Sequence, residues 1–229
     1  MERHFEQEFA ALKDQLLAMG GRAENIVQKA MAALKTRNVA LANEVFLDDR
    51  QIDALELAID ERSVNLLALR QPLAGDLRFI TAALKITNDL ERVGDHAVNI
   101  AGSAIRLAEQ PQLKPLVDLP RMADMASGML HDALDAFVRR DAETARRLVR
   151  RDDEVDDLNT QVFRELITFM IEDPHTITRA MELILVARNL ERVADLATNV
   201  AEEVVFIAEA RVIKHHAEQF AEQDDFGRT

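Results

Sequence analysis

A twelve-residue motif occurs twice in this chain, one hundred residues apart. It reads LERVGDHAVNIA at Leu90–Ala101 and LERVADLATNVA at Leu190–Ala201, and eight of the twelve positions are identical. A shorter pair agrees with it, because IDAL at Ile52–Leu55 matches VDDL at Val155–Leu158 at an offset of 103 residues. Recurrence of this kind indicates a tandem repeat with the same order of elements in each copy.

We expect the two repeats to occupy residues 1–113 and 114–229. The offset changes from 103 to 100 residues between the two matching pairs, so the second copy lacks three residues somewhere between them. The loops that read QPLAG in the first repeat and EDPH in the second are where such a change is best tolerated.

The first helix is predicted from a seam of apolar residues at steps of three and four, the period of a helix packed against near-parallel neighbours. The seam consists of Phe5, Phe9, Leu12, Leu16, Met19, Ala23, Ile26, Ala30 and Ala33. Gly20 and Gly21 interrupt it, and two adjacent glycines favour a kink.

Prolines mark the breaks between helices, because the residue before a proline disfavours helix. They stand at Pro72, at Pro111, Pro115 and Pro120, and at Pro174. The second helix is predicted from the N-cap Asn38 to about Leu69, and the third from Asp76 to about Glu109.

The second repeat is predicted to follow the same plan. Asp141 stands eleven residues before Asp152, as Asn38 stands before Asp49. The predicted fold class is all-α: two tandem three-helix antiparallel bundles, six long helices in all, related by an internal pseudo-twofold repeat. The last segment, Lys214–Thr229, loses the apolar period and is predicted to be a frayed polar tail.

Composition excludes several classes of function. Lysine and arginine number 28 against 41 acidic residues, a net charge of −13 that opposes binding to nucleic acid. There is no cysteine, hence no disulfide and no thiolate metal site. No secretion signal and no membrane span is recognisable, so a cytoplasmic protein without membrane insertion is expected.

Acidic residues form stripes at equivalent places in the two repeats. Residues four apart share one helix face. The stripes are Asp49 and Asp53 with Glu91 and Asp95 in the first repeat, and Asp152 and Asp156 with Glu191 and Asp195 in the second; Asn99 and Asn199 extend them. If the second and third helices are antiparallel neighbours, each repeat holds one band of four carboxylates.

Two interpretations of these bands remain open on the pattern alone. Clustered carboxylates repel one another, and hard oxygen ligands suit magnesium, manganese or iron. Alternatively, each band is a solvated face paired with Arg50, Arg92 and Arg192.

Other candidate sites are weaker. A di-iron site of the ferritin type needs Glu-x-x-His on helices, but Glu172–His175 contains Pro174 and falls in a predicted loop. His96 follows Asp95 directly and is expected to point away from the acidic stripe. No glycine-rich phosphate loop or catalytic motif is present, so no catalytic or cofactor-binding residues are predicted.

A basic cluster lies beside the second acidic stripe. It consists of Arg139, Arg140, Arg146, Arg147, Arg150 and Arg151. Such a run is usually a solvated, salt-bridged face, and docking of an acidic partner or of anionic headgroups is the alternative.

The combination of these features resembles the PhoU family. The resemblance rests on QPLAGDLR at Gln71–Arg78, on LERVGDHAVNIA, and on RNLERVADLATNVAEEVVF at Arg188–Phe206, and it covers nearly the whole chain. One departure is that the family's second motif often reads ADH, where this chain has Ala194-Asp195-Leu196. Because that position points off the carboxylate stripe, its change is expected to affect packing or a partner surface.

The resemblance implies a cytoplasmic, non-enzymatic negative regulator of phosphate uptake and of the phosphate-starvation response. It implies a homodimer that links the ATPase subunit of the phosphate ABC transporter to a phosphate-sensing histidine kinase. It also implies metal ions (Fe, Mn, Mg or Zn) at the E/DxxxD motifs. These map to Asp49, Asp53, Glu91, Asp95, Asp152, Asp156, Glu191 and Asp195.

Two further functions stay open. A helical-bundle metalloenzyme would need an open coordination position and a general base. A pure scaffold without metal would be indifferent to chelators.

Overall fold

The computed structural model describes residues 2–70 and 72–211, and every regular element in this part of the chain is helical. The first half holds α1 (Glu2–Thr36), α2 (Val39–Arg70) and α3 (Ala74–Ala108). The second half holds α4 (Asp118–Arg139), α5 (Ala142–Val149), α6 (Asp152–Glu172), the short 3-10 helix η1 (Pro174–Thr176) and α7 (Ile177–Glu209). The predicted all-α class is confirmed. The expectation for Lys214–Thr229 lies outside the described residues.

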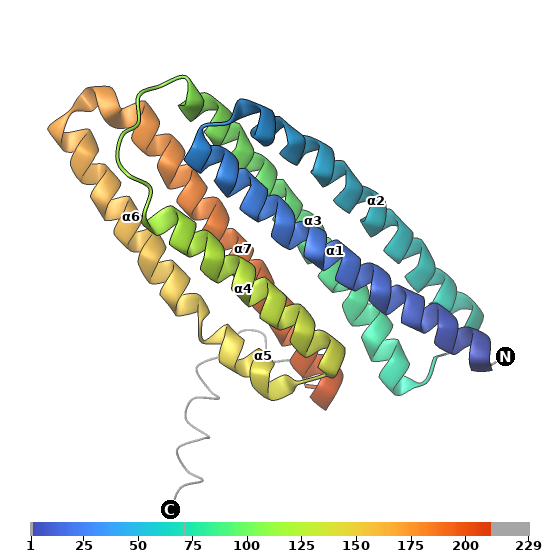
Figure 1. Ribbon diagram of the computed structural model, residues 1–229. Helices are drawn as coiled ribbons and strands as arrows, with labels where there is room; N and C mark the ends of the chain where they lie inside the picture. Colours follow the sequence, from blue (N-terminus) through green and yellow to red (C-terminus); the bar gives the residue numbers. More distant parts are fainter. Residues whose placement is uncertain (1, 71, 212–229) are drawn as a thin grey trace, which may run out of the picture.

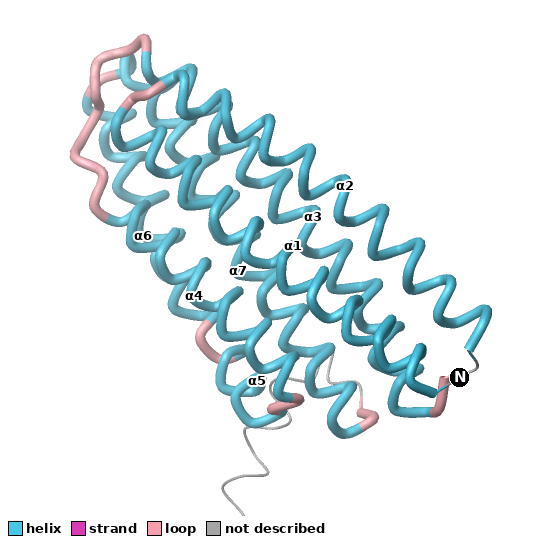
Figure 2. Tube along the Cα trace, turned by 45° about the vertical axis from the view of Figure 1, so that its right-hand side comes forward, coloured by secondary structure: helices cyan, strands magenta, loops and turns pink. Residues whose placement is uncertain are grey.

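The long helices lie side by side along one axis of an elongated molecule (Figures 1 and 2). Helices α1, α3, α4 and α7 pack against one another as a central bundle, with α2 against α1 and α3 on one flank, and α6 against α7 and α4 on the other. The two halves therefore share one core. No helix in residues 2–70 and 72–211 carries an apolar stretch long enough to cross a lipid bilayer.

The predicted apolar seam of α1 faces this core. Its members from Leu12 to Ala33 are buried, and Phe5 and Phe9 are partly buried against them. Aromatic rings continue the contact across the halves, because the Phe79 ring of α3 lies 4.8 Å from that of Phe9 and 4.6 Å from that of Phe137 on α4. Burial of such rings is a major part of the apolar driving force for folding.

Equivalent N-cap residues begin α2 in the first half and α5 in the second half. The Asn38 side chain accepts a hydrogen bond from the Leu41 backbone N–H at 3.0 Å. Asp141 accepts from the N–H groups of Glu143 and Thr144 at 3.1 and 3.0 Å. The predicted correspondence of Asn38 and Asp141 is therefore confirmed.

The segment of the second half that corresponds to α2 is not the single helix that the repeat predicts. It is interrupted at Arg150 and Arg151, between α5 and α6. Basic residues end α5, and three acids, from Asp152 to Glu154, open α6. Both suit the dipoles of two separate helices. The first half has α2 as one continuous helix.

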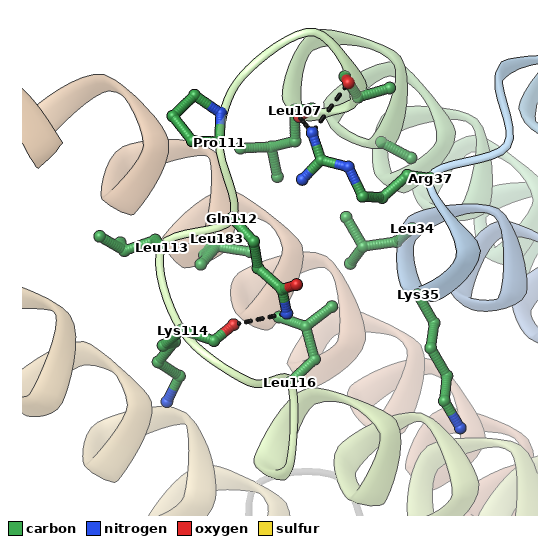
Figure 3. A pocket seen from close by; sticks show the side chains of 12 residues that line it. Leu34, Lys35, Arg37, Leu107, Pro111, Gln112, Leu113, Lys114, Leu116 and Leu183 are labelled. Carbon is green, nitrogen blue, oxygen red and sulfur yellow. Dashed lines mark hydrogen bonds between the residues drawn. The ribbon is translucent and has the colours of Figure 1, made fainter.

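The connection between the halves is held from several sides (Figure 3). The Arg37 guanidinium donates to the carbonyl oxygens of Leu107 and Ala108 at 2.9 and 2.8 Å and also to that of Gln110, which caps the end of α3. Arg179 of α7 donates to the Pro111 carbonyl oxygen at 3.1 Å. The linker encloses a small apolar pocket of about 30 Å³.

The adjacent glycines of α1 give a matched test of the packing. The helix is continuous through both. A Cβ at Gly20 would lie 2.2 Å from Leu134 Cδ1 of α4, whereas one at Gly21 would meet nothing within 4 Å. Gly20 therefore allows close approach of α1 and α4.

We expect Gly21→Ala to raise the free energy of unfolding by about 0.5–1 kcal/mol, because alanine favours helix and has room. Gly20→Val is expected to lower it by about 1–3 kcal/mol, because the added carbons overpack the Leu134 contact. Urea denaturation followed by circular dichroism measures both. Equal effects of the two substitutions would contradict the close approach.

Candidate carboxylate sites at the junction of the repeats

Helices α3 and α7 pack antiparallel about a pseudo-twofold axis. Lys85 Nζ lies 3.0 Å from both carboxylate oxygens of Glu203, and Arg106 Nε lies 2.6 Å from Glu182 Oε1. Lys85 precedes Gly94 by nine residues and Glu203 follows its counterpart Ala194 by nine; Arg106 and Glu182 are each twelve residues away on the opposite sides. The two copies of the repeated motif therefore cross at Gly94 and Ala194.

In the first half, α2 and α3 bring the predicted carboxylates together. Burial raises the pKa of Asp49 to about 6, with added repulsion from Asp53 and Asp95. The pKa of Glu91 is also raised, by burial first and then by Asp95 and by Glu56. The acidic band of the first repeat is thus formed, and the predicted packing of α2 against α3 is confirmed.

Glu56 belongs to this band although the motif did not include it. Burial and the neighbouring Asp60, Asp53 and Asp95 raise the pKa of its carboxyl. The sequence signal was present, because Glu56 lies seven residues after Asp49 on the same face of α2.

Gly94 shapes the first site. A Cβ at this residue would stand 2.5 Å from Asp49 Oδ1, so any side chain here would displace the carboxylate. The second repeat has the buried Ala194 at the equivalent position. In the second repeat, the acidic residues Asp152 and Asp156 lie on α6, which begins after a break in the helix.

In the second half, Asp152 opens α6 and faces α7. Burial raises its pKa to about 7, and Asp195 and Asp156 add repulsion. Burial likewise raises the pKa values of Asp156 and Glu191, again with repulsion from Asp195. The second acidic band is therefore formed as well.

Arginine neutralises the second band only in part. Arg192 Nη1 lies 2.6 Å from Asp195 Oδ2, whereas Asp152 Oδ1 is buried without a hydrogen-bond partner among the described residues. In the first repeat, the equivalent Arg92 lies 3.4 Å from Asp89. The proposed pairing of arginines with the bands thus holds for Arg192 and Asp195.

The donor chemistry of both bands fits a hard metal ion. Carboxylates from two helices face each other, burial and then mutual repulsion raise the pKa values of Asp49 and Asp152, and the buried Asp152 Oδ1 has no hydrogen-bond partner among the described residues. In residues 2–70 and 72–211, however, no three acidic or histidine side chains are positioned to hold an ion together. Metal binding would therefore require side-chain rotation.

His96 lies away from the acidic stripe, as predicted. Its Nδ1 is 2.8 Å from Asn189 Oδ1 across the α3–α7 contact. Its counterpart Leu196 is buried, and it lines an open pocket beside Asp152 and Asp195. The departure from the family motif therefore places a buried apolar side chain at this position.

The contacts of the basic cluster and of the Glu172–His175 pair show what these two predicted features are. The basic cluster is extensively salt-bridged: Arg139 to Asp135, Arg146 to Glu209, Arg147 to Glu143 and Arg151 to Asp132. This agrees with a solvated, salt-bridged face. His175 lies in η1 with its side chain 93% exposed and hydrogen-bonds Asp173, so the Glu172–His175 pair is not a helical metal motif.

The raised pKa values of Asp49 and Asp152 predict a pH-dependent stability. Both carboxyls hold a proton more tightly in the folded chain than in the unfolded chain. Their ionisation therefore opposes folding above pH 7, and this opposition is relieved as the pH falls through 7 and 6. We expect the metal-free protein to gain on the order of 2 kcal/mol between pH 8 and pH 5, after discounting for solvent screening.

Urea denaturation across this pH range measures the gain. Asp152→Asn is expected to raise stability at pH 8 and to flatten the pH profile, while the exposed Asp14→Asn leaves the profile unchanged. A stability that stays constant from pH 8 to pH 5 would contradict the raised pKa values of these buried carboxyls.

Known proteins share the sequence and the fold of this chain. A profile of the PhoU domain matches residues 16–104 and 119–204. The phosphate-specific transport system accessory protein PhoU homolog of Aquifex aeolicus is 44% identical over 91% of this chain and 95% of its own. The homologue of Caulobacter vibrioides is 42% identical over 89% of both chains.

Two crystal structures agree in fold. PhoU from Pseudomonas aeruginosa superposes with a TM-score of 0.87 at 39% identity, covering 90% of this chain and 100% of its own. The phosphate transport system regulatory protein PhoU from Streptococcus pneumoniae gives 0.85 at 28% identity, covering 92% and 99%. Sequence and fold thus agree over nearly the whole length, and the chain belongs to the PhoU family.

Proposed function

We propose that this protein is an accessory protein of phosphate transport that acts as a negative regulator. It restrains phosphate uptake and keeps the phosphate-starvation response off when phosphate is abundant. The observation that carries this proposal is the similarity to named phosphate-transport accessory proteins, which spans 91% of this chain and 95% of the relative. The match of the PhoU domain to both halves of the chain agrees with this similarity.

In this proposal the protein is a cytoplasmic adaptor without catalytic activity. It contacts the ATPase subunit of the phosphate ABC transporter and a phosphate-sensing histidine kinase, and it forms a homodimer. Long helices suit this role because they present rigid faces. Apolar side chains are exposed on these faces, among them Leu57 and Val64 on α2 and Phe163, Ile171 and Met181 on α6 and α7.

The regulatory role is tested by deleting the gene and measuring a phosphate-starvation reporter in phosphate-rich medium. We expect the reporter to become active and to be silenced by the intact gene supplied in trans. Affinity capture from cells grown in high and low phosphate should recover the transporter ATPase and the kinase. A reporter that stays fully repressed in the deletion strain would refute the proposed role.

We further propose that the two carboxylate bands hold metal ions, iron or manganese by the hardness of their oxygen donors, with magnesium and zinc as the other candidates. Asp49, Asp53, Glu91 and Asp95 would hold one group of ions. Asp152, Asp156, Glu191 and Asp195 would hold the other. Burial, and then repulsion from neighbouring carboxylates, raises the pKa values of Asp49 and Asp152, and a bound cation would offset both effects.

Manganese or iron added to chelator-treated protein is expected to stabilise it, by about 2.7 kcal/mol at a free metal concentration of 100 Kd. Elemental analysis should show that Glu91→Gln with Asp95→Asn removes one half of the bound metal and Glu191→Gln with Asp195→Asn the other half. Unchanged melting temperature and no retained metal would support a scaffold that works without metal.

A further inference from the structure

The outer face of the α6–α7 pair changes character along its length. The two helices pack against each other and are joined at one end through η1, so they run antiparallel (Figure 1). Steps of three and four residues stay on one face of a helix. Such steps lead from Asp156 along α6 to Phe163, Ile167 and Met170, and from Glu191 backwards along α7 to Ile184, Met181 and Ile177. The face is therefore acidic at one end and apolar at the other.

The apolar end, which we call the apolar face, consists of Phe163, Ile167, Met170, Ile177, Met181 and Ile184. The side chains of Phe163, Ile177 and Met181 are 47%, 46% and 46% exposed, and the other three are partly buried. The exposed Ile171 and Leu185 extend its borders. Contiguous apolar surface of this kind is typical of a site where another molecule binds.

The repeat does not require apolar residues here. Asp60 of α2 is equivalent to Phe163 by the offset of 103 residues, and Thr81 of α3 is equivalent to Met181 by the offset of 100. The first half thus forms the same pair of helices with polar residues at these positions. The apolar face is a property of the second half and is not needed to build the fold.

The charges beside the apolar face are unbalanced. Arg164 of α6 and Arg188 of α7 border it, both are exposed, and neither makes an ion pair within the part of the chain that the structure describes. The carboxylates of the same stretch, Glu172 excepted, already have cationic or histidine partners: Glu165 pairs with Lys114, Glu182 with Arg106 and Asp173 with His175. Two guanidiniums are therefore available to acidic groups of another molecule.

An amphipathic helix fits both features. Two antiparallel helices offer ridges on which a third helix packs, as α4 does on the buried side of α6 and α7. Such a helix presents apolar side chains at steps of three, four and seven residues. Acidic residues at the margins of that apolar stripe would lie beside Arg164 and Arg188 and form charge-assisted hydrogen bonds with them.

We propose that the apolar face binds an amphipathic helix of a partner protein, with apolar side chains on Phe163, Ile177 and Met181 and acidic side chains beside Arg164 and Arg188. The inference rests on the proposed function and deepens it, because it assigns the adaptor a docking surface on its second half. The apolar face begins two helical turns beyond Asp156 and Glu191, so no proposed metal ligand belongs to it.

Site-specific photo-crosslinking identifies the occupant. The probe is the full-length protein with Met181 replaced by a benzophenone amino acid, irradiated in cells grown in high and in low phosphate. We expect mass spectrometry to find a crosslinked peptide with apolar residues at helical spacing and acidic residues beside them. No crosslink, a crosslink only to a second copy of this chain, or a peptide without acidic residues would overturn the proposal.

Matched variants locate the contact. Fluorescence anisotropy measures the affinity for a synthetic copy of the crosslinked peptide. Phe163→Asp and Met181→Thr install the residues of the first half, and each is expected to weaken binding about tenfold or more. Leu57→Thr is the control, because it installs the residue of the second half on the exposed face of α2 and should leave the affinity unchanged. Thermal melts identify misfolded variants, and equal affinities in all three would refute the docking surface.

A charge swap tests the acidic margins separately. Arg164→Glu combined with Arg188→Glu is expected to weaken binding about tenfold or more, and a peptide whose acidic residues are changed to lysine should recover it. Arg121→Glu, at an exposed arginine of α4, is the control and should change neither affinity. Undiminished binding of the original peptide by the double variant would overturn the acidic occupant.

Failure of this inference is distinguishable from failure of the proposed function. If the deletion strain activates the starvation reporter but Met181 crosslinks to no acidic helix, regulation stands and the docking surface is wrong. If Met181 crosslinks to such a helix but the reporter ignores the deletion, the docking surface stands and the regulatory role is wrong.

Discussion

The close antiparallel contact of α3 with α7 is the constraint on which the rest of the structure depends. It is made of small or aliphatic residues at its centre, with Gly94 and Ala194 both buried, and of ion pairs toward its ends. Glu203 is buried there with its carboxylate against Lys85. The Lys85 side chain is 54% exposed and the Glu203 side chain only 4%, so Lys85 compensates a buried carboxylate, and the pair favours one register of the helices. Both carboxylate sites lie beside this contact.

The two carboxylate sites differ although the same four acidic positions recur in each repeat. The first has Gly94 beneath Asp49, a fifth carboxylate from Glu56, and His96 bonded across the junction. The second has Ala194 in place of Gly94 and Asn159 in place of Glu56, and its acidic helix α6 begins at Asp152. Each difference is small, but the second site differs in that one oxygen of Asp152 is buried without a hydrogen-bond partner among the described residues and Arg92 of the other repeat lies beside it.

Much of the fold followed from sequence because it depends on local patterns. The period of the α1 seam, the caps at Asn38 and Asp141 and the prolines all act within a few residues of their own position. The eight carboxylates were also predictable, because spacing by four fixes a helix face.

What escaped prediction depends on contacts between distant segments. The break before α6 is accompanied by an ion pair between Arg151 and Asp132 of α4, which no pattern within this stretch reveals. The position of Arg92 beside the second site follows only from the crossing of α3 and α7, and no spacing within one repeat reveals it.

The pseudo-twofold axis through Gly94 and Ala194 relates the two repeats in the way that a symmetry axis relates the two subunits of a dimer. A contact in which equivalent residues meet is the geometry of an isologous dimer. A chain of one repeat would present this face to a second copy of itself, and both sites would then be identical by symmetry. In a chain that joins two repeats through the linker held by Arg37 and Arg179, symmetry no longer requires that identity. Equivalent positions can then hold different residues, as His96 and Leu196 do, and the two sites differ in character.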